Sequence, residues 1–242
     1  MKRTALLALL ILTATAADAK PFKFESKTRY AEVDFAYSTE AASVPALVRR
    51  FQADLAKERT QTVACGKAET KVRVESGGEG IACSSSTGIT TSGQTPQLLS
   101  LAQAYYAFTG GAHGNGATTP LLWDRRLGKE VKFASLFSAP NGYAAILRGP
   151  YCRALDAERK KRRGPDYQPS SMVPEFDACP KFSELSLIPS GSPRFGQVHV
   201  IAAPYIAGPY AEGDYDIVLP VSARLVAALK PEFRGSFAPQ PQ

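Results

Sequence analysis

A histidine set among glycines marks the first place where this sequence could support chemistry. His113 lies in the run YYAFTGGAHGNGATTPLLWD, and the second histidine, His199, lies in a separate segment. An imidazole can bind a metal ion or act as a general base, and glycines let a backbone approach a ligand closely. The spacing supports neither a metal site nor a phosphate loop, because there is no HExxH pair and no GxGxxG order. The segment therefore predicts either a structural turn or a loop that contacts a ligand.

A second segment, Pro204–Gly213, is rich in tyrosine, proline and glycine. Its tyrosines and nearby Tyr215 each offer an apolar ring and a polar hydroxyl, which suits recognition of a sugar or a protein. The alternative is that these rings pack a loop against the core. We expect this segment to lie close to the glycine–histidine turn. The binding residues predicted from the two segments are Gly111, His113, Asn115, Tyr205, Tyr210 and Glu212.

The sequence contains no recognised motif for nucleophilic catalysis. The serine clusters at 84–86 and 190–192 lack the GxSxG pattern of a nucleophile elbow. A serine or histidine enzyme stays open as an alternative, because catalytic triads are defined by geometry and not by sequence order. We therefore predict a non-catalytic protein with no cofactor and no metal, and keep an uncharacterised envelope hydrolase as the alternative.

A run of consecutive cations, Arg159–Arg163, follows Glu158 in the sequence ERKKRR. At the end of a helix such cations interact favourably with the negative pole of the helix dipole, which predicts a solvated helix end. The functional alternative is contact with lipid phosphates, anionic glycans or peptidoglycan carboxylates.

The beginning of the chain reads as a secretory signal peptide. Lys2 and Arg3 precede a short apolar run, and Ala17-Asp18-Ala19 forms a small-residue cleavage site. Cleavage after residue 19 lowers the net charge from +7 to +6, because Lys2, Arg3 and Asp18 are removed. No later stretch reaches the length of a membrane span. We expect a periplasmic or secreted protein without a transmembrane segment after cleavage.

The cysteines predict disulfides in an oxidising compartment. Their four positions allow three pairings, and we predict Cys65–Cys83 and Cys152–Cys179 because each closes a local loop. Zinc is the rival interpretation, but there is no CxxC and there are too few histidines to complete a tetrahedral site.

The order of periodic segments predicts an α+β fold, with antiparallel sheets, two or three packed helices and two intimately associated halves. A helix is expected from Val44 to Leu55, a strand at 69–75, and a second helix at 141–163 that Gly149-Pro150 breaks or kinks. Ser222 is expected to cap a last helix that Pro231 stops. Further strands are expected at 98–108, 118–124, 185–189, 197–202 and 214–219. The predicted organisation is a signal peptide at 1–19, halves at 20–117 and 118–234, and a disordered tail at 235–242.

Three stretches carry a resemblance to a known group of exported bacterial domains. They are YAFTGGAHGN, LLWDRRLGKEVKFASLF and IAAPYIAGPYAEGDYDIVLP. The chain resembles the extracellular, lysozyme-sensing part of the anti-sigma factor RsiV and the non-catalytic N-terminal region of the peptidoglycan deacetylase PdaC. The resemblance assigns the first half to the PdaC-like part and the second to the RsiV-like part. It implies a cell-envelope binding module of unknown detailed function, with no catalysis of its own.

The expected partner is a cell-wall glycan, peptidoglycan or another anionic wall polymer. A wall-associated protein such as lysozyme, bound or inhibited, is the alternative. Animal-type lysozymes are basic, so a chain of net charge +6 meets long-range repulsion, which only a local acidic patch at Glu212, Asp214 and Asp216 could offset. Nucleic acid is not expected as a partner, because no recognised binding motif is present.

Overall fold

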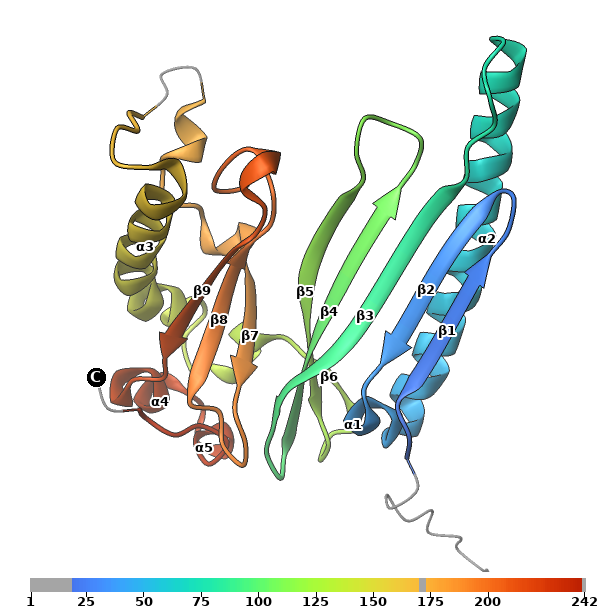
Figure 1. Ribbon diagram of the computed structural model, residues 1–242. Helices are drawn as coiled ribbons and strands as arrows, with labels where there is room; N and C mark the ends of the chain where they lie inside the picture. The colour runs from blue at the N-terminus through green and yellow to red at the C-terminus, as the bar shows by residue number, and fades with distance from the viewer. Residues whose placement is uncertain (1–18, 170–172, 241–242) are drawn as a thin grey trace, which may run out of the picture.

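The computed structural model describes residues 19–169 and 173–240. The predicted signal peptide, up to residue 18, lies outside the described residues. Two sheets lie side by side, one of six strands and one of three, and each carries helices on one of its faces (Figure 1). The predicted α+β class is confirmed.

The larger sheet has the strand order β1-β2-β3-β4-β5-β6. All neighbouring pairs are antiparallel except β2 with β3, which is parallel. The larger sheet is therefore mixed and not wholly antiparallel, because a long helix connects β2 to β3 and returns the chain in the same direction. The strands are β1 (Phe22–Lys27), β2 (Ala31–Tyr37), β3 (Cys83–Gln94), β4 (Leu98–Phe108), β5 (Asn115–Asp124) and β6 (Lys129–Val131).

The connecting helix, α2 (Pro45–Glu75), covers one face of this sheet. It follows the short helix α1 (Thr39–Ala42) and is longer than the sequence predicts. The prediction of a strand at 69–75 is wrong, since these residues form the last turns of α2. The buried stripe passes from Leu47, Phe51 and Leu55 to Thr62, Gly66 and Thr70. Because the later positions are small or polar, the helical hydrophobic period disappears from the sequence although the packing continues.

Gly66 allows α2 to approach the turn between β1 and β2. A Cβ at this position would lie 1.7 Å from the carbonyl oxygen of Tyr30. Helix propensity alone predicts that Gly66→Ala stabilises the protein by about 1 kcal/mol. The steric overlap reverses that sign, and we expect a loss of roughly 1–3 kcal/mol in the free energy of unfolding, measured by urea denaturation. Gly235→Ala, where a Cβ has no neighbour within 4 Å, is the matched control and should be nearly neutral.

The smaller sheet is antiparallel and has the order β7-β8-β9, with β7 (Ser186–Ser190), β8 (Gln197–Ala202) and β9 (Tyr215–Pro220). Helix α3 (Gly142–Arg163) covers one face of it. The helix continues through Gly149-Pro150, where the sequence predicts a break or kink. Leu147, Tyr151 and Leu155 form the buried stripe of α3. This packing compensates for the hydrogen bond that Pro150 cannot make.

Shorter helical segments complete the C-terminal half. As predicted, the Ser222 hydroxyl caps a helix, α4, by accepting a hydrogen bond from Leu225 N. Pro231 ends no helix; it opens the next one, where a missing N–H costs nothing. These segments are α4 (Ala223–Ala228), α5 (Pro231–Arg234), η2 (Phe133–Leu136), η3 (Pro174–Phe176), η4 (Phe182–Glu184) and η5 (Tyr210–Glu212).

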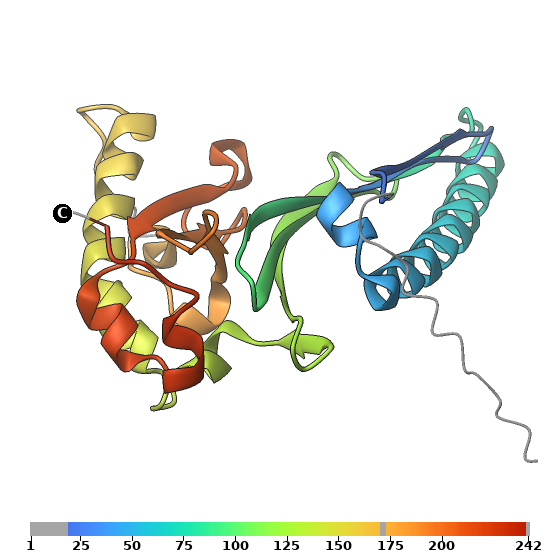
Figure 2. The ribbon, with the colours of Figure 1, turned by 90° about the horizontal axis from the view of Figure 1, so that it is seen from below.

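The two halves are joined through the sheet face that α2 leaves uncovered. Leu98 and Leu122 of the large sheet belong to the core of the C-terminal half, and β7 contacts β3, β4 and β5. Seen from below, the large sheet lies between α2 and the small sheet (Figure 2). The predicted boundary at residues 117 and 118 falls inside β5, which pairs with β4 along its length.

The segment from Gly235 packs in the structure as far as residue 240. The sequence predicts a disordered tail here, and for residues 235–240 this is corrected. Phe237 is fully buried and its ring contacts Phe195 at a centroid distance of 5.2 Å. Phe195 anchors this segment, because its N–H donates to the carbonyl oxygen of Ser236 and its own carbonyl oxygen accepts from Ala238 N. The apolar ring therefore outweighs the disorder that the prolines and glutamines indicate; residues 241 and 242 lie outside the described part.

Candidate functional site

The glycine–histidine turn and the Pro204–Gly213 segment meet at one end of the molecule, as the sequence predicts. The His113 ring stacks on Tyr210 at a centroid distance of 3.8 Å. Its Nε2 lies 3.3 Å from the Tyr205 hydroxyl, and the rings of Tyr205 and Tyr210 are 5.8 Å apart. We call these three side chains the aromatic bridge. It connects the β4–β5 loop of the large sheet to the β8–β9 loop of the small one.

Both loops hold conformations that their sequences make possible. Gly110 has a φ of +94°, and a Cβ on Gly114 would lie 2.4 Å from the Tyr106 ring. The His113 ring is held by a 2.9 Å contact between its Nδ1 and the carbonyl oxygen of Gly114. Tyr205 has a φ of +70°, which is strained for a residue with a side chain, and strain of this kind gathers at functional sites.

A groove of about 500 Å³ lies beside the aromatic bridge. One wall is the uncovered face of the large sheet and the other is the β8–β9 loop. Because side chains alternate along a strand, Ala104 and Tyr106 of β4 face the same side as Gly116 and Thr118 of β5, their neighbours in register. The wall from the loop consists of Pro204, Tyr210, Ala211, Glu212, Gly213 and Asp214. We call this space the binding groove.

Tyr106 is a groove residue that the sequence analysis missed. It is 42% exposed and lies in the strand expected at 98–108. The signal available was the adjacent pair Tyr105-Tyr106, since two aromatics in a row on a strand must face opposite sides. Of the predicted residues, Tyr210 and Glu212 line the groove. The lining does not include Gly111, His113, Asn115 or Tyr205.

The Glu212 carboxylate is held in place by hydrogen bonds from a buried arginine. Arg163 donates hydrogen bonds to its carboxylate at 2.7 and 3.0 Å, and the Tyr215 hydroxyl donates a further one. Burial by itself raises the pKa of Glu212, but the hydrogen bonds from Arg163 and Tyr215 outweigh it and lower the pKa. Burial, and then the bond to Glu212, raise the pKa of Tyr215 to about 12. Tyr215 therefore packs in the core, and Glu212 positions the loop.

Asp214 is the groove carboxylate whose oxygens are left to accept hydrogen bonds from a ligand. Among the described residues, no side chain forms a hydrogen bond or ion pair with it. Burial, together with the negative charge of Asp216, raises the pKa of Asp214. Asp216 itself bonds the second histidine, with 2.9 Å between its Oδ2 and His199 Nδ1, and this bond raises the pKa of His199. His199 lies on β8 and takes no part in the aromatic bridge.

The basic run at the end of α3 is partly an internal clamp, which corrects the expected solvated helix end. The side chains of Arg159 and Arg163 are only 5% and 4% exposed. Arg159 donates to the carbonyl oxygens of Ala207, Asp177 and Ala178. The run therefore binds both the β8–β9 loop and the segment that precedes Cys179. The lysines between these arginines face solvent.

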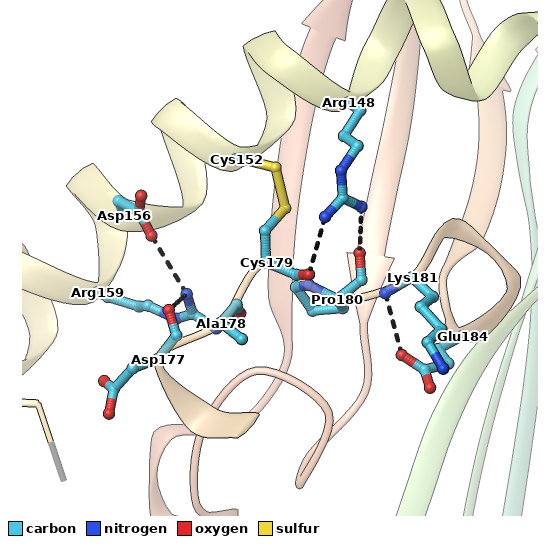
Figure 3. Close-up of a disulfide and its surroundings, with 10 residues drawn as sticks. All are labelled: Arg148, Cys152, Asp156, Arg159, Asp177, Ala178, Cys179, Pro180, Lys181 and Glu184. Atoms are coloured by element: carbon cyan, nitrogen blue, oxygen red, sulfur yellow. Dashed lines mark hydrogen bonds and ion pairs between the residues drawn. A yellow bond between two sulfur atoms is a disulfide. The ribbon is translucent and has the colours of Figure 1, made fainter. Parts of the chain in front are cut away.

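Both predicted disulfides are present. Cys65–Cys83 joins α2 to the start of β3, and Cys152–Cys179 joins α3 to the loop that Arg159 binds (Figure 3). Arg148, one turn before Cys152, donates to the carbonyl oxygens of Cys179 and Pro180. The loop behind the groove is thus held covalently and by charged hydrogen bonds. Two disulfides fit an oxidising compartment.

Within residues 19–169 and 173–240, no group of three or more histidine, cysteine, aspartate or glutamate side chains is arranged to hold a metal ion. None of the helices in the same part of the chain combines the length and apolar character needed to cross a bilayer.

Comparison with solved structures identifies the fold. A DUF3298 family protein from Pseudomonas aeruginosa aligns with a TM-score of 0.50 and 17% identity, over 91% of this chain and 97% of that one. A member of the same family from Bacteroides fragilis aligns with a TM-score of 0.53 and 17% identity, over 89% and 95%. Neither a family model nor a curated sequence matches this chain. At this identity the likeness shows a shared fold, that of a domain of unknown function.

Proposed function

We propose that this protein is a non-catalytic glycan-binding module of the cell envelope, and that the binding groove is its ligand site. The observation that carries the proposal is that an exposed tyrosine, a half-buried tyrosine and a carboxylate without a described side-chain partner line one groove. Tyr106 lies on the sheet wall, and Tyr210 and Asp214 lie on the loop wall. Sugar rings present apolar faces to aromatic side chains and hydroxyls to carboxylates, so the groove matches both features of a saccharide.

The charges of the groove indicate which class of sugar it favours. Glu212 and Asp214 are the carboxylates of its loop wall, and the exposed lysines of the basic run do not line it. An anionic polymer is therefore expected to bind elsewhere on the basic surface, whereas the groove favours neutral or amine-bearing sugar units. Peptidoglycan offers neutral amino sugars along its backbone and is the proposed wall ligand.

Retention on insoluble peptidoglycan tests this function. We expect the mature protein to sediment with peptidoglycan in high salt, because stacking and neutral hydrogen bonds are not screened. Asp214→Asn, which keeps the shape but removes the charge, should weaken retention several-fold. Glu232→Gln, at an exposed position of α5 outside the lining of the groove, is the control. Retention that disappears in high salt would mean that only the basic surface binds peptidoglycan, through electrostatic attraction. Capture of soluble lysozyme without retention on peptidoglycan would favour the sensor or inhibitor alternative.

A further inference from the structure

The uncovered face of the large sheet continues the binding groove across the strands. The register places Ala36 of β2, Gly88 of β3 and Ala104 of β4 in one row, which ends at Thr118 of β5. All four residues face away from α2, because core residues beneath that helix lie an odd number of positions away on the same strands, and side chains alternate along a strand. These core residues are Tyr37, Ile89, Leu101 and Leu121. The row is made of small side chains, so it forms a shallow floor.

A second pocket lies at the far end of this row. It has a volume of about 740 Å³ and includes Lys23, Ala36, Gly88 and Thr90 in its lining. Its opposite side is formed by Gly191 and Ser192, from the turn after β7. The binding groove begins where the row reaches Ala104 and Thr118. The two pockets therefore occupy the two ends of one strip of the same sheet face, which we call the trough.

The middle of the trough is open. A Cβ built on Gly88 has no atom within 4 Å, and its backbone φ is not among the positive values. The next row up the sheet runs from Asp34 through Ser86 to Tyr106. Asp34, Ser86 and Tyr106 are exposed, so the trough has hydroxyl and carboxylate groups along one side and an aromatic ring near the groove.

We propose that the trough binds one linear oligosaccharide that crosses the strands from the binding groove to the pocket at Lys23. This inference rests on the proposed function and specifies its ligand as a chain of several sugar units. From β1 to β5 the sheet spans about 19 Å across its strands, which is too long for a single sugar or a disaccharide to cover. The occupant is a glycan and not an added β-strand, because the trough lies on the face of the sheet, where no backbone N–H or C=O is free.

The discriminating experiment measures affinity against ligand length. Binding of chitobiose and chitohexaose, which are short and long oligomers of N-acetylglucosamine, is measured by calorimetry for the wild type and for Gly88→Gln. We expect the wild type to bind the hexaose about tenfold or more tightly than the biose, because extra sugar units bury further apolar surface. Gly88→Gln places a side chain across the trough, and should lower hexaose affinity to that of the biose. The biose is expected to bind in the binding groove, whose lining does not include Gly88.

Two controls keep the result interpretable. Thr119→Gln adds the same side chain at an exposed position on the opposite face of β5, and should bind both oligomers like the wild type. Thermal unfolding of Gly88→Gln should show unchanged or raised stability, since glycine weakens a strand interior. Equal wild-type affinity for both oligomers, or a Gly88→Gln variant that binds like the wild type, overturns the trough and leaves the glycan-binding function standing. Failure of the wild type to bind either oligomer overturns both the trough and the glycan-binding function. If the wild type captures lysozyme and Gly88→Gln does not, the face is a protein-docking surface instead.

Discussion

Replacing Arg163 with methionine is expected to lower the free energy of unfolding by about 3–5 kcal/mol, the range for a buried ion pair that loses one partner. Arg163 is 4% exposed and contacts the carboxylates of Asp177 and Glu212, at 2.7 Å each. It also donates to the carbonyl oxygens of Phe176 and Ala207. Methionine keeps much of the volume but leaves these acceptors without their donor. Urea denaturation followed by circular dichroism measures the loss.

Lys161→Met is the matched control for this variant. Lys161 lies in the same run, but its side chain is 79% exposed and only approaches Glu158 at 3.8 Å. Surface substitutions of this kind usually change the free energy of unfolding by less than about 0.5 kcal/mol. Equal stability of the Arg163 and Lys161 variants would contradict the internal clamp.

The same ion pair predicts an acid dependence. The folded pKa of Glu212 is lowered from its ordinary value of 4.5. Its contribution to stability is therefore fully present above pH 4.5 and is lost as the pH falls through the lowered folded value. In Arg163→Met the bond that lowers this pKa is absent, so the variant should lose less stability than the wild type on acidification below pH 4.5. Unfolding curves at neutral pH and below this value compare the two slopes.

Replacing Tyr210 with alanine is expected to weaken glycan binding by about 10- to 100-fold. Burying an aromatic side chain against a ligand contributes about 1.5–3 kcal/mol, and each 1.4 kcal/mol corresponds to a factor of ten in affinity. Tyr210 lies on a surface loop and is half-buried, so the free energy of unfolding should change by less than about 1 kcal/mol. Retention on peptidoglycan and calorimetry with soluble oligomers measure the binding loss. Thermal unfolding then separates it from loss of the fold.

Neighbouring tyrosines in β4 provide an internal control for the same experiment. Tyr106→Ala should weaken binding to a similar extent, because its ring faces the groove. Tyr105→Ala should change binding much less: Tyr105 borders the groove, but its side chain, 44% exposed, lies on the opposite face of the strand beside Glu58 of α2. Equal effects of the two substitutions would show that tyrosine surface in general, and not the groove, retains the glycan.

His113 is expected to act through Tyr210. Because the two rings stack at 3.8 Å, His113→Ala should weaken binding less than Tyr210→Ala, and the double variant should be no weaker than Tyr210→Ala alone. Additive losses would instead indicate that His113 contacts the ligand directly.

Local patterns in the sequence determined much of this protein. Short loops between paired cysteines predicted both disulfides, and alternation with turn residues predicted β4, β5 and the three strands of the small sheet. The tyrosine- and glycine-rich segments predicted that His113 and Tyr210 meet. These features depend on neighbours in the chain or on composition that only a turn or an exposed loop tolerates, so the sequence carries their signal.

The tertiary structure alone decided the remaining features. The later turns of α2 bury threonine and glycine, which carry no helical hydrophobic period, so only packing against the sheet reveals them. Arg163 reads as a solvated cation until the fold places Asp177 and Glu212 around it. Gly88 and Ala104 carry no distinctive signal in the sequence, yet register across separate strands pairs them, with Gly88 lining one pocket and Ala104 the other. In each case the deciding interaction joins residues far apart in the chain, and its energy depends on a neighbour that no local pattern specifies.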